Sequence, residues 1–415
     1  MAETEIPEYF LCPISLEMMK EPVTAVTGIT YERESIEQWL RKAKECVCPV
    51  TKQPLPRSSQ YLTPNHTLRR LIQAWSEATN AARGHGADHQ QIPNPQLEKV
   101  QVEKLVKDLK VPHRNQRALK KLHGFAMESE RTRTCMAEAG VANAMVMFIN
   151  QRFQQGKSKT MCLEEALRIL HLTWNIPSRT NMKALVGENL DFINSLTWIL
   201  DLNVHKNNVK IVNEAMPLLK LTIQNTNSTI LGNLNFQFFK GMVRVLGKRT
   251  ISQQALKSTL QILIETCPLG RNRKSIVESG AVSDLIELEL EKPEKNISEL
   301  IFNLLAHLCS CAEGREMFLK HAAAIAMVSK RILRVSSATD DRAIHILSVI
   351  GKYSGSKEVV LEMLRVGAVS KLCMVIQADC ASYLKEKARG ILRLHSKVWS
   401  DSPCIQLYLL TRYQR

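Results

Sequence analysis

Apolar residues recur with helical spacing through residues 98–400, and a longer period is superimposed on that spacing. Short apolar phrases return along the chain: "ALKKLHG" at 118, "ALRILHL" at 166, "AMPLLKL" at 215, "TLQILIE" at 259, "IFNLLAH" at 301, "AIHILSV" at 343 and "ARGILRL" at 388. Successive starts are 42 to 49 residues apart, which is the length of a repeat built from two or three helices. The pattern predicts a stack of helical repeats, because one repeat alone cannot bury its apolar face.

A second phrase marks helix starts in the last repeats. "ESGAVSDLIEL" at 278, "KHAAAIAMVSK" at 320 and "RVGAVSKLCMV" at 365 place Gly-Ala-Val, or a variant of it, before an apolar helix. Together with the period, this phrase resembles armadillo repeats over most of 98–400, most closely in the last three. The resemblance implies about six to seven repeats in an α-solenoid with a groove for extended peptides or partner helices. We expect this groove to hold a protein substrate.

The first 78 residues carry a different pattern. Residues 23–26 and 29–31 are rich in β-branched and aromatic side chains and flank Gly28, which predicts two short strands joined by a tight turn. A helix is predicted near Glu34, and a second helix begins after Asn65, a residue well suited to cap it. The stretch "CVCPVTKQPL" between them is a loop fixed by its prolines.

The cysteines of this segment raise the question of a metal site. A two-zinc cross-brace needs four Cys or His ligands for each ion, and the whole segment offers only Cys12, Cys46, Cys48 and His66. Two zinc ions are excluded by that count, and the spacing of Cys46 and Cys48 is poor for one. We expect hydrogen-bonded pairs to stand in place of metal, formed by some of Ser15, Glu17, Glu21, Thr30, Arg33 and Glu34. No metal and no other cofactor is expected.

Five phrases of this segment follow the order and spacing of a U-box: "CPISLEMMKEPV", "GITYER", "SIEQWL", "CPVT" and "LTPNHTLRRLIQAW". With Pro7 and Phe10, the match spans residues 6–77. The resemblance implies a small α+β domain similar to a RING finger whose metals are replaced by polar pairs. It also implies ubiquitin-ligase activity, in which the domain docks a ubiquitin-charged conjugating enzyme and promotes transfer to a substrate lysine.

The resemblance further implies a docking surface for the conjugating enzyme. It places Ile14 and Leu16 in a first loop, Trp39 on the central helix and Pro49 in a second loop. Lys52 takes the place of a cation, often Arg, that bridges the conjugating enzyme and ubiquitin, and the change to Lys leaves the strength of activation open. Periodicity alone leaves two alternatives: Leu16 and Trp39 as core residues, and Lys52 as a solvated loop lysine.

No catalytic nucleophile is predicted on this chain. Nothing in the local sequence supplies a base beside Cys12, Cys46 or Cys48 that would generate a reactive thiolate. We interpret them as core or loop residues, with Cys12 buried. Catalysis would then consist of orienting a thioester for attack by lysine.

The charge is concentrated in the repeats. The 415 residues carry a net charge of +16; residues 1–78 contribute −1 (9 basic, 10 acidic) and residues 79–96 contribute 0, which leaves +17 for the rest. Such a surface is expected of lysine-rich helix faces that keep a protein soluble, and it would also suit an acidic or phospholipid-associated partner, so peripheral membrane contact stays open. Nucleic acid is not expected, because no aromatic stacking surface is evident. A nuclear-import-type receptor is disfavoured, because the ninth positions after the repeat starts show no asparagine ladder: Asn175, Gln224, Pro268, Ser310, Lys352 and Lys397.

These observations predict a mainly α protein, with a small α+β U-box at 5–79, a flexible linker at 80–97, armadillo repeats at 98–400 and a C-terminal tail at 401–415. Eleven scattered cysteines, an odd number, favour a reducing compartment. We therefore expect a cytoplasmic protein, with nuclear and peripheral membrane locations left open.

The combination resembles the plant U-box armadillo ubiquitin ligases. That resemblance implies a conjugating enzyme, ubiquitin and a protein substrate as partners, with degradation of the substrate in stress or defence signalling. Homo- or hetero-oligomers through the U-box stay open. The alternatives are a non-catalytic armadillo scaffold with an inactive U-box and a zinc-dependent nucleic-acid binder.

Overall fold

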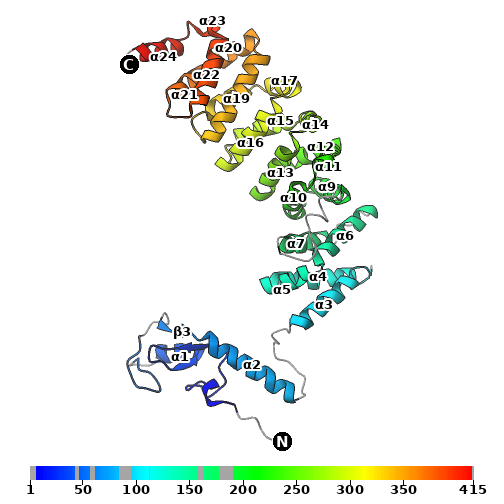
Figure 1. Ribbon diagram of the computed structural model, residues 1–415, viewed down its shortest axis with the longest axis vertical. Helices are drawn as coiled ribbons and strands as arrows, with labels where there is room; N and C mark the ends of the chain where they lie inside the picture. The colour runs from blue at the N-terminus through cyan, green and yellow to red at the C-terminus, as the bar shows by residue number, and fades with distance from the viewer. Residues whose placement is uncertain are drawn as a thin grey trace. The chain divides into compact units, whose positions relative to one another are not determined.

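The computed structural model describes residues 6–42, 46–56, 61–83, 95–111, 113–156, 162–174, 176 and 190–413. The chain divides into two compact units, Met1–Ile92 and Pro93–Arg415, called here the first and the second unit. Figure 1 shows strands and helices in the first unit and only helices in the described part of the second.

The first unit combines a small sheet with two helices. Its elements are a 3-10 helix Glu8–Phe10, β1 Pro22–Thr24, β2 Thr30–Glu32, α1 Arg33–Lys42, β3 Thr63–Pro64 and α2 His66–Arg83. The antiparallel strands lie in the order β2-β1-β3, with Val23 opposite both Tyr31 and Pro64. Gly28 has a φ of 82°, the left-handed conformation that a tight turn between β1 and β2 requires.

A separate apolar core holds the first unit together. The predicted cap is confirmed, because the Asn65 side chain accepts the N–H of Leu68 at 3.0 Å and so satisfies the start of α2. Trp75 on α2 packs edge-on against Phe10, with ring centroids 5.8 Å apart. The buried residues of this core are Phe10, Cys12, Met19, Val23, Ala25, Tyr31, Ile36, Leu40, Cys48, Leu55, Leu62 and Ile72.

The second unit is a stack of helices around one continuous core. Its first part comprises α3 Pro95–Asp108, α4 Asn115–Glu128, α5 Glu130–Glu138, α6 Val141–Gln154, α7 Leu163–Thr173, α9 Leu190–His205, α10 Val209–Gln224, α11 Ser228–Gly232, α12 Phe236–Leu246 and α13 Gln253–Thr266. The rest comprises α14 Gly270–Glu278, α15 Ala281–Leu290, α16 Lys295–Leu308, α17 Ala312–Lys320, α18 Ala324–Arg331, α19 Ser337–Tyr353, α20 Lys357–Arg365, α21 Ala368–Gln377, α22 Ser382–Leu394, α23 Ser396–Trp399 and α24 Pro403–Tyr413.

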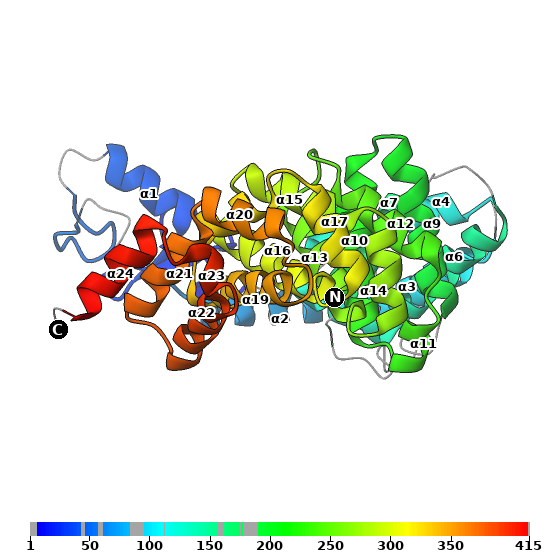
Figure 2. The same cartoon turned by 90° about the horizontal axis from the view of Figure 1, so that it is seen from above.

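Every repeat motif found in the sequence lies on a helix of one continuous row. The row consists of α4, α7, α10, α13, α16, α19 and α22, each packed against the next, and we call them the ladder helices. In Figure 1, α7, α10, α13, α16 and α19 follow one another along one side of the stack, and Figure 2 views the same row from above. The first residue of each motif is buried between neighbouring repeats: Ala118, Ala166, Ala215, Thr259, Ile301, Ala343 and Ala388. The predicted stacking is therefore confirmed.

The Gly-Ala-Val phrase starts helices as predicted. Gly280 and Gly367 have φ values of 90° and 80°, and α15 and α21 begin at the next residue. Because a side chain at such φ strains the backbone, glycine is favoured there. In the variant phrase, Ala323 precedes α18 with an ordinary φ of −89°.

Helices extend into both the predicted linker and the predicted C-terminal tail. α2 continues to Arg83 and α3 begins at Pro95, a residue suited to the first position of a helix, so both ends of the range 80–97 are helical. Residues 84–94 of that range lie outside the described residues. In the predicted tail, residues 403–413 form α24, because Cys404, Ile405 and Tyr408 pack against the apolar core. No helix among the described residues has the length and apolar character needed to span a membrane.

Candidate functional site

Two loops of the first unit have the same backbone structure. Cys12-Pro-Ile-Ser-Leu-Glu17 and Cys48-Pro-Val-Thr-Lys-Gln53 start 36 residues apart, since 48 − 12 = 36. In the first loop, Leu16 donates its N–H to the Cys12 carbonyl at 2.8 Å, and Cys12 donates to the Glu17 carbonyl at 2.8 Å. In the second loop, Lys52 donates to the Cys48 carbonyl at 3.0 Å, and Cys48 donates to the Gln53 carbonyl at 2.8 Å. The pairs Leu11–Met18 and Val47–Pro54 close the two loops in the same way.

The thiols of these loops fasten both of them to strand β2. The Cys48 Sγ lies 2.9 Å from the Tyr31 hydroxyl and accepts the Thr51 N–H at 3.3 Å. The Cys12 Sγ accepts the N–H of Glu32 at 3.3 Å. Because Tyr31 and Glu32 are neighbours on β2, one short strand positions both loops.

The hydrogen bonds to sulfur shift both thiols toward the thiolate. Burial opposes ionisation of Cys48, but hydrogen bonds from Thr27, Thr51 and Tyr31 outweigh it and lower the pKa of this thiol to about 6. Burial likewise opposes ionisation of Cys12, and hydrogen bonds, among them the N–H groups of Ser15 and Glu32, lower its pKa as well. Burial raises the pKa of the Tyr31 hydroxyl, as does its hydrogen bond to Cys48. Both thiols are fully buried, so neither can take ubiquitin from a carrier enzyme.

The expected polar pairs form only in part. Arg33 lies 3.4 Å from Glu21, and the Thr30 and Thr24 hydroxyls are 2.9 Å apart. The main carboxylate is one that the sequence did not single out, because Glu32 accepts the N–H groups of Lys20 and Glu21 at 2.6 and 3.0 Å. The Arg33–Glu21 pair is substantially exposed and contributes at most about 1 kcal/mol. The buried polar contacts of this unit therefore centre on the two thiols.

No group of three or more His, Cys, Asp or Glu side chains within the described residues is placed to hold a metal ion. The sulfur atoms of Cys12 and Cys48 are instead acceptors for backbone and hydroxyl groups. These hydrogen bonds tie both loops to β2.

The side chains that the sequence assigned to docking lie on these loops and on α1. Leu16 is 74% exposed and Trp39 is 36% exposed, so neither is a core residue. The Trp39 indole N–H donates to the Val47 carbonyl at 2.9 Å, which ties α1 to the second loop. Ile14 and Pro49 are half-buried.

The tip of the second loop adds one charged and one apolar side chain. Lys52 is exposed and forms no ion pair with a described residue. Val50, 50% exposed, was missed by sequence analysis, although it occupies the place in "CPVT" that Ile14 occupies in "CPIS". The surface thus combines exposed apolar side chains, a fixed indole and a free cation.

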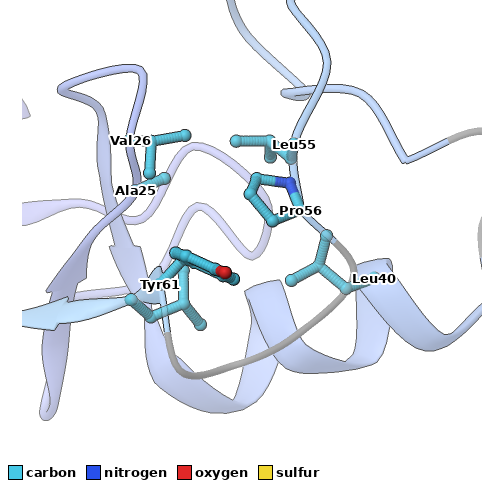
Figure 3. A pocket seen from close by; sticks show the side chains of 7 residues that line it. Ala25, Val26, Leu40, Leu55, Pro56 and Tyr61 are labelled. Atoms are coloured by element: carbon cyan, nitrogen blue, oxygen red, sulfur yellow. The ribbon is translucent and has the colours of Figure 1, made fainter.

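A shallow pocket lies elsewhere on the first unit. Ala25 and Val26, Leu40, Leu55 and Pro56, and Tyr61 and Leu62 line it (Figure 3). Its lining is apolar apart from the Tyr61 hydroxyl and contains none of the residues assigned to docking. It therefore offers no chemistry for catalysis.

Comparison with known proteins identifies both units. The U-box domain model matches residues 6–81, and the model of the plant U-box protein ARM repeat region matches residues 101–415. The Arabidopsis thaliana E3 ubiquitin-protein ligases PUB23 and PUB24 are 40% and 41% identical to this chain; each alignment covers 99% of this chain and 98% and 96%, respectively, of the relative. The related PUB22 is 38% identical over 99% of both chains.

A crystal structure of an engineered protein, target OR497, shares the fold. It superposes with a TM-score of 0.51 at 15% identity, covering 79% of this chain and 80% of the other. The predicted fold class, mainly α with a small α+β U-box before an armadillo solenoid, is thereby confirmed. The chain belongs to the family of plant U-box armadillo-repeat E3 ubiquitin-protein ligases.

Proposed function

We propose that the first unit docks a ubiquitin-charged conjugating enzyme and that the second unit recruits the protein that receives the ubiquitin. The docking surface consists of Ile14, Leu16, Trp39, Pro49 and Lys52. The observation that carries the proposal is the exposure of Leu16 and Trp39 on a rigid frame. Exposed apolar side chains that are already ordered lose little entropy on binding, so a few of them can anchor a small interface.

The chemistry proposed is orientation of a thioester. The apolar side chains bind the conjugating enzyme, and the Lys52 ammonium contacts carbonyl groups of the enzyme or of ubiquitin, which restricts the thioester to conformations open to attack. The substrate lysine attacks the thioester carbon, the carrier's thiolate leaves, and no bond to this chain forms. The interface is proposed to be small, so that a discharged carrier leaves before the next one binds.

Single-turnover discharge tests this proposal. A purified conjugating enzyme loaded with ubiquitin is mixed with free lysine, with and without the full-length protein, and loss of the thioester is followed on non-reducing gels. We expect at least tenfold acceleration by the wild type and near-background rates for Trp39→Ala. Tyr61→Ala is the matched control, because it removes an exposed aromatic side chain from the pocket face instead.

The outcome also separates the ligase from a non-catalytic scaffold. A wild type that accelerates discharge from none of a panel of conjugating enzymes contradicts the proposal and supports the scaffold. Equal losses for Trp39→Ala and Tyr61→Ala would place the docking surface elsewhere.

We further propose that the modified substrate is degraded, in a stress or defence pathway, and that the protein is cytoplasmic. Membership of the ligase family supports the first proposal, and the odd number of cysteines, eleven, is in keeping with a reducing compartment. Capture of ubiquitylated proteins from plant cells that express wild type or Trp39→Ala tests the pathway. Substrates that accumulate in cells expressing the variant support degradation, and substrate half-lives equal in the two cell lines contradict it.

A further inference from the structure

Polar side chains occupy matching positions on three consecutive ladder helices. Gln261 on α13, Asn303 on α16 and His345 on α19 each lie two residues after the motif start of their helix, so they occupy equivalent positions. His307 lies one turn after Asn303, and Arg342 lies one turn before His345. All five side chains are half-buried, and α16 packs against both α13 and α19. We call these five residues the ladder cluster.

The ladder cluster has no partners inside the protein. None of its five side chains forms a hydrogen bond or an ion pair with any part of the chain that the structure describes. The side-chain oxygens of Gln261 and Asn303 are enclosed and unpaired, although buried polar atoms are nearly always paired with protein or water. The adjacent acid is already used, because Asp341 on α19 accepts a hydrogen bond from Lys387 on α22 at 2.9 Å.

Burial and nearby cations favour the neutral form of both histidines in the ladder cluster. Burial lowers the pKa of His307, and the nearby charges of Arg342, Arg273 and His345 lower it further. Burial likewise lowers the pKa of His345, with Lys387 as the leading charge that adds to the effect and Asp341 opposing it. On α16 the acid Glu299 lies two turns away from His307. On α16 the nearest acid to His307 is therefore two turns away, and on α19 the Asp341 carboxylate beside Arg342 is already bonded to Lys387.

We propose that the ladder cluster binds an extended peptide segment with a negatively charged side chain, a carboxylate or a phosphate, seated between His307, Arg342 and His345. Arg342 supplies a planar set of donors for such an anion. The side-chain NH2 groups of Gln261 and Asn303, whose oxygens are enclosed, donate to carbonyl groups of the peptide backbone. This inference rests on the proposed recruitment of substrates by the second unit and names the chemistry that it selects.

The repeat spacing suits a peptide better than a free anion. Packed helices lie about 9 Å apart, which about three residues of an extended chain span at roughly 3.3 Å each. A segment of about seven residues therefore reaches from α13 to α19 and can contact one polar side chain in each repeat. A free anion would occupy only the His307–Arg342 end and leave both amides unpaired.

Fluorescence polarisation with the full-length protein tests the inference. The probes are labelled heptapeptide pools, degenerate except for a central phosphoserine, glutamate, serine or lysine. We expect the phosphoserine pool, the glutamate pool or both to bind at least tenfold more tightly than the serine and lysine pools. Of the phosphoserine and glutamate pools, the one that binds more tightly identifies the anion as a phosphate or a carboxylate. Equal binding of all four pools, or tightest binding of the lysine pool, overturns the inference.

Variants locate the binding site. Arg342→Ala should weaken binding of the anionic pool at least tenfold, and Arg342→Lys should retain part of it. Asn303→Ala should weaken the binding of every peptide pool by a similar factor. Arg365→Ala is the matched control, because Arg365 lies on α20 and is paired with Glu362 at 2.6 Å. Anionic peptides that bind Arg342→Ala as tightly as the wild type, with the helix content of both proteins equal by circular dichroism, place the site elsewhere and overturn the inference.

Two further measurements distinguish this inference from a nucleic-acid site and from the ligase proposal. A single-stranded RNA oligonucleotide that binds more tightly than every peptide pool would overturn it in favour of a nucleic-acid site. Ubiquitin discharge to free lysine should not change in Arg342→Ala, because that reaction needs no substrate peptide. If discharge is accelerated and no anionic peptide binds, only the present inference fails; if peptides bind and discharge is not accelerated, only the ligase proposal fails.

Discussion

Leu16 and Lys52 occupy the same position in two loops, and both have a left-handed backbone, with φ values of 57° and 60°. Each donates its N–H to the carbonyl of the cysteine that opens its loop. The left-handed conformation costs about 1 kcal/mol for a residue with a Cβ atom, and here it turns one apolar and one cationic side chain outward. This relationship gives a way to separate docking from stability.

Leu16→Gly should lower activity without destabilising the first unit. Glycine relieves the left-handed strain but makes the unfolded chain more flexible, so we expect the free energy of unfolding to stay within about 1 kcal/mol of the wild type. Loss of the exposed isobutyl group should reduce ubiquitin discharge about tenfold. Urea unfolding and single-turnover discharge measure the two quantities, and a Gly variant with full discharge activity would remove Leu16 from the docking surface.

Lys52 should act through its charge and the geometry of that charge. Lys52→Arg should increase discharge severalfold, because a guanidinium can donate to two carbonyl groups at once. Lys52→Ala should lower the rate of ubiquitin discharge severalfold. It should have little effect on binding of a conjugating enzyme that carries no ubiquitin. Lys20→Ala, an exposed lysine of the same unit, is the control. If Lys52→Ala and Lys20→Ala lower discharge equally, Lys52 is only a solvated loop residue.

The stability of the first unit should rise with pH between about 6 and 9. The Cys48 thiol has its pKa lowered from 9.0 to about 6, so above pH 6 the unfolded chain binds more protons than the folded one. The contribution is complete above pH 9 and is lost as pH falls through 6, amounting to about 2 kcal/mol between pH 6 and 8. Hydrogen exchange of the backbone amides of residues 23–40, corrected for the intrinsic exchange rates, measures this pH dependence of stability.

Substitutions test whether Cys48 is the source of that slope. Cys48→Ala should flatten the pH dependence, and Tyr31→Phe should reduce it, because it removes the hydroxyl that lies 2.9 Å from the sulfur. Cys46→Ala is the control, since Cys46 is only half-buried and next to the same loop. A slope that persists in Cys48→Ala would assign it to another group.

The repeats could be predicted from the sequence because their period is carried by side chains that must be buried, such as Ala166 and Ile301. The state of Leu16 could not, because its apolar spacing is the same whether it faces the core or the solvent. Its left-handed φ has no sequence signal either, since glycine is the usual residue there.

Two other features depend on tertiary contacts that the local sequence does not encode. Residues 403–413 fold as α24 because Ile405 and Tyr408 cover the apolar end of the stack. Glu32 and Tyr31 organise the first unit through partners 11 to 20 residues away. Ser15 and Glu21 could be proposed as polar residues near the core, but only the fold decides which of them finds a partner.

Removing one partner of a buried ion pair in the second unit should cost more stability than replacing both partners. Arg331 on α18 reaches Glu289 on α15, with its Nε 2.6 Å from the carboxylate, which also accepts a hydrogen bond from Ser298 at 3.0 Å. Burial raises the pKa of Glu289 despite these partners.

Arg331→Ala should lower the free energy of unfolding of the second unit by about 3–5 kcal/mol, because it leaves a buried carboxylate unpaired. The double variant Arg331→Met/Glu289→Leu should regain most of that loss, because both charges are replaced by apolar side chains. Thermal unfolding followed by circular dichroism measures both variants, and a double variant no more stable than Arg331→Ala would show that the lost contacts, and not the unpaired charge, set the cost.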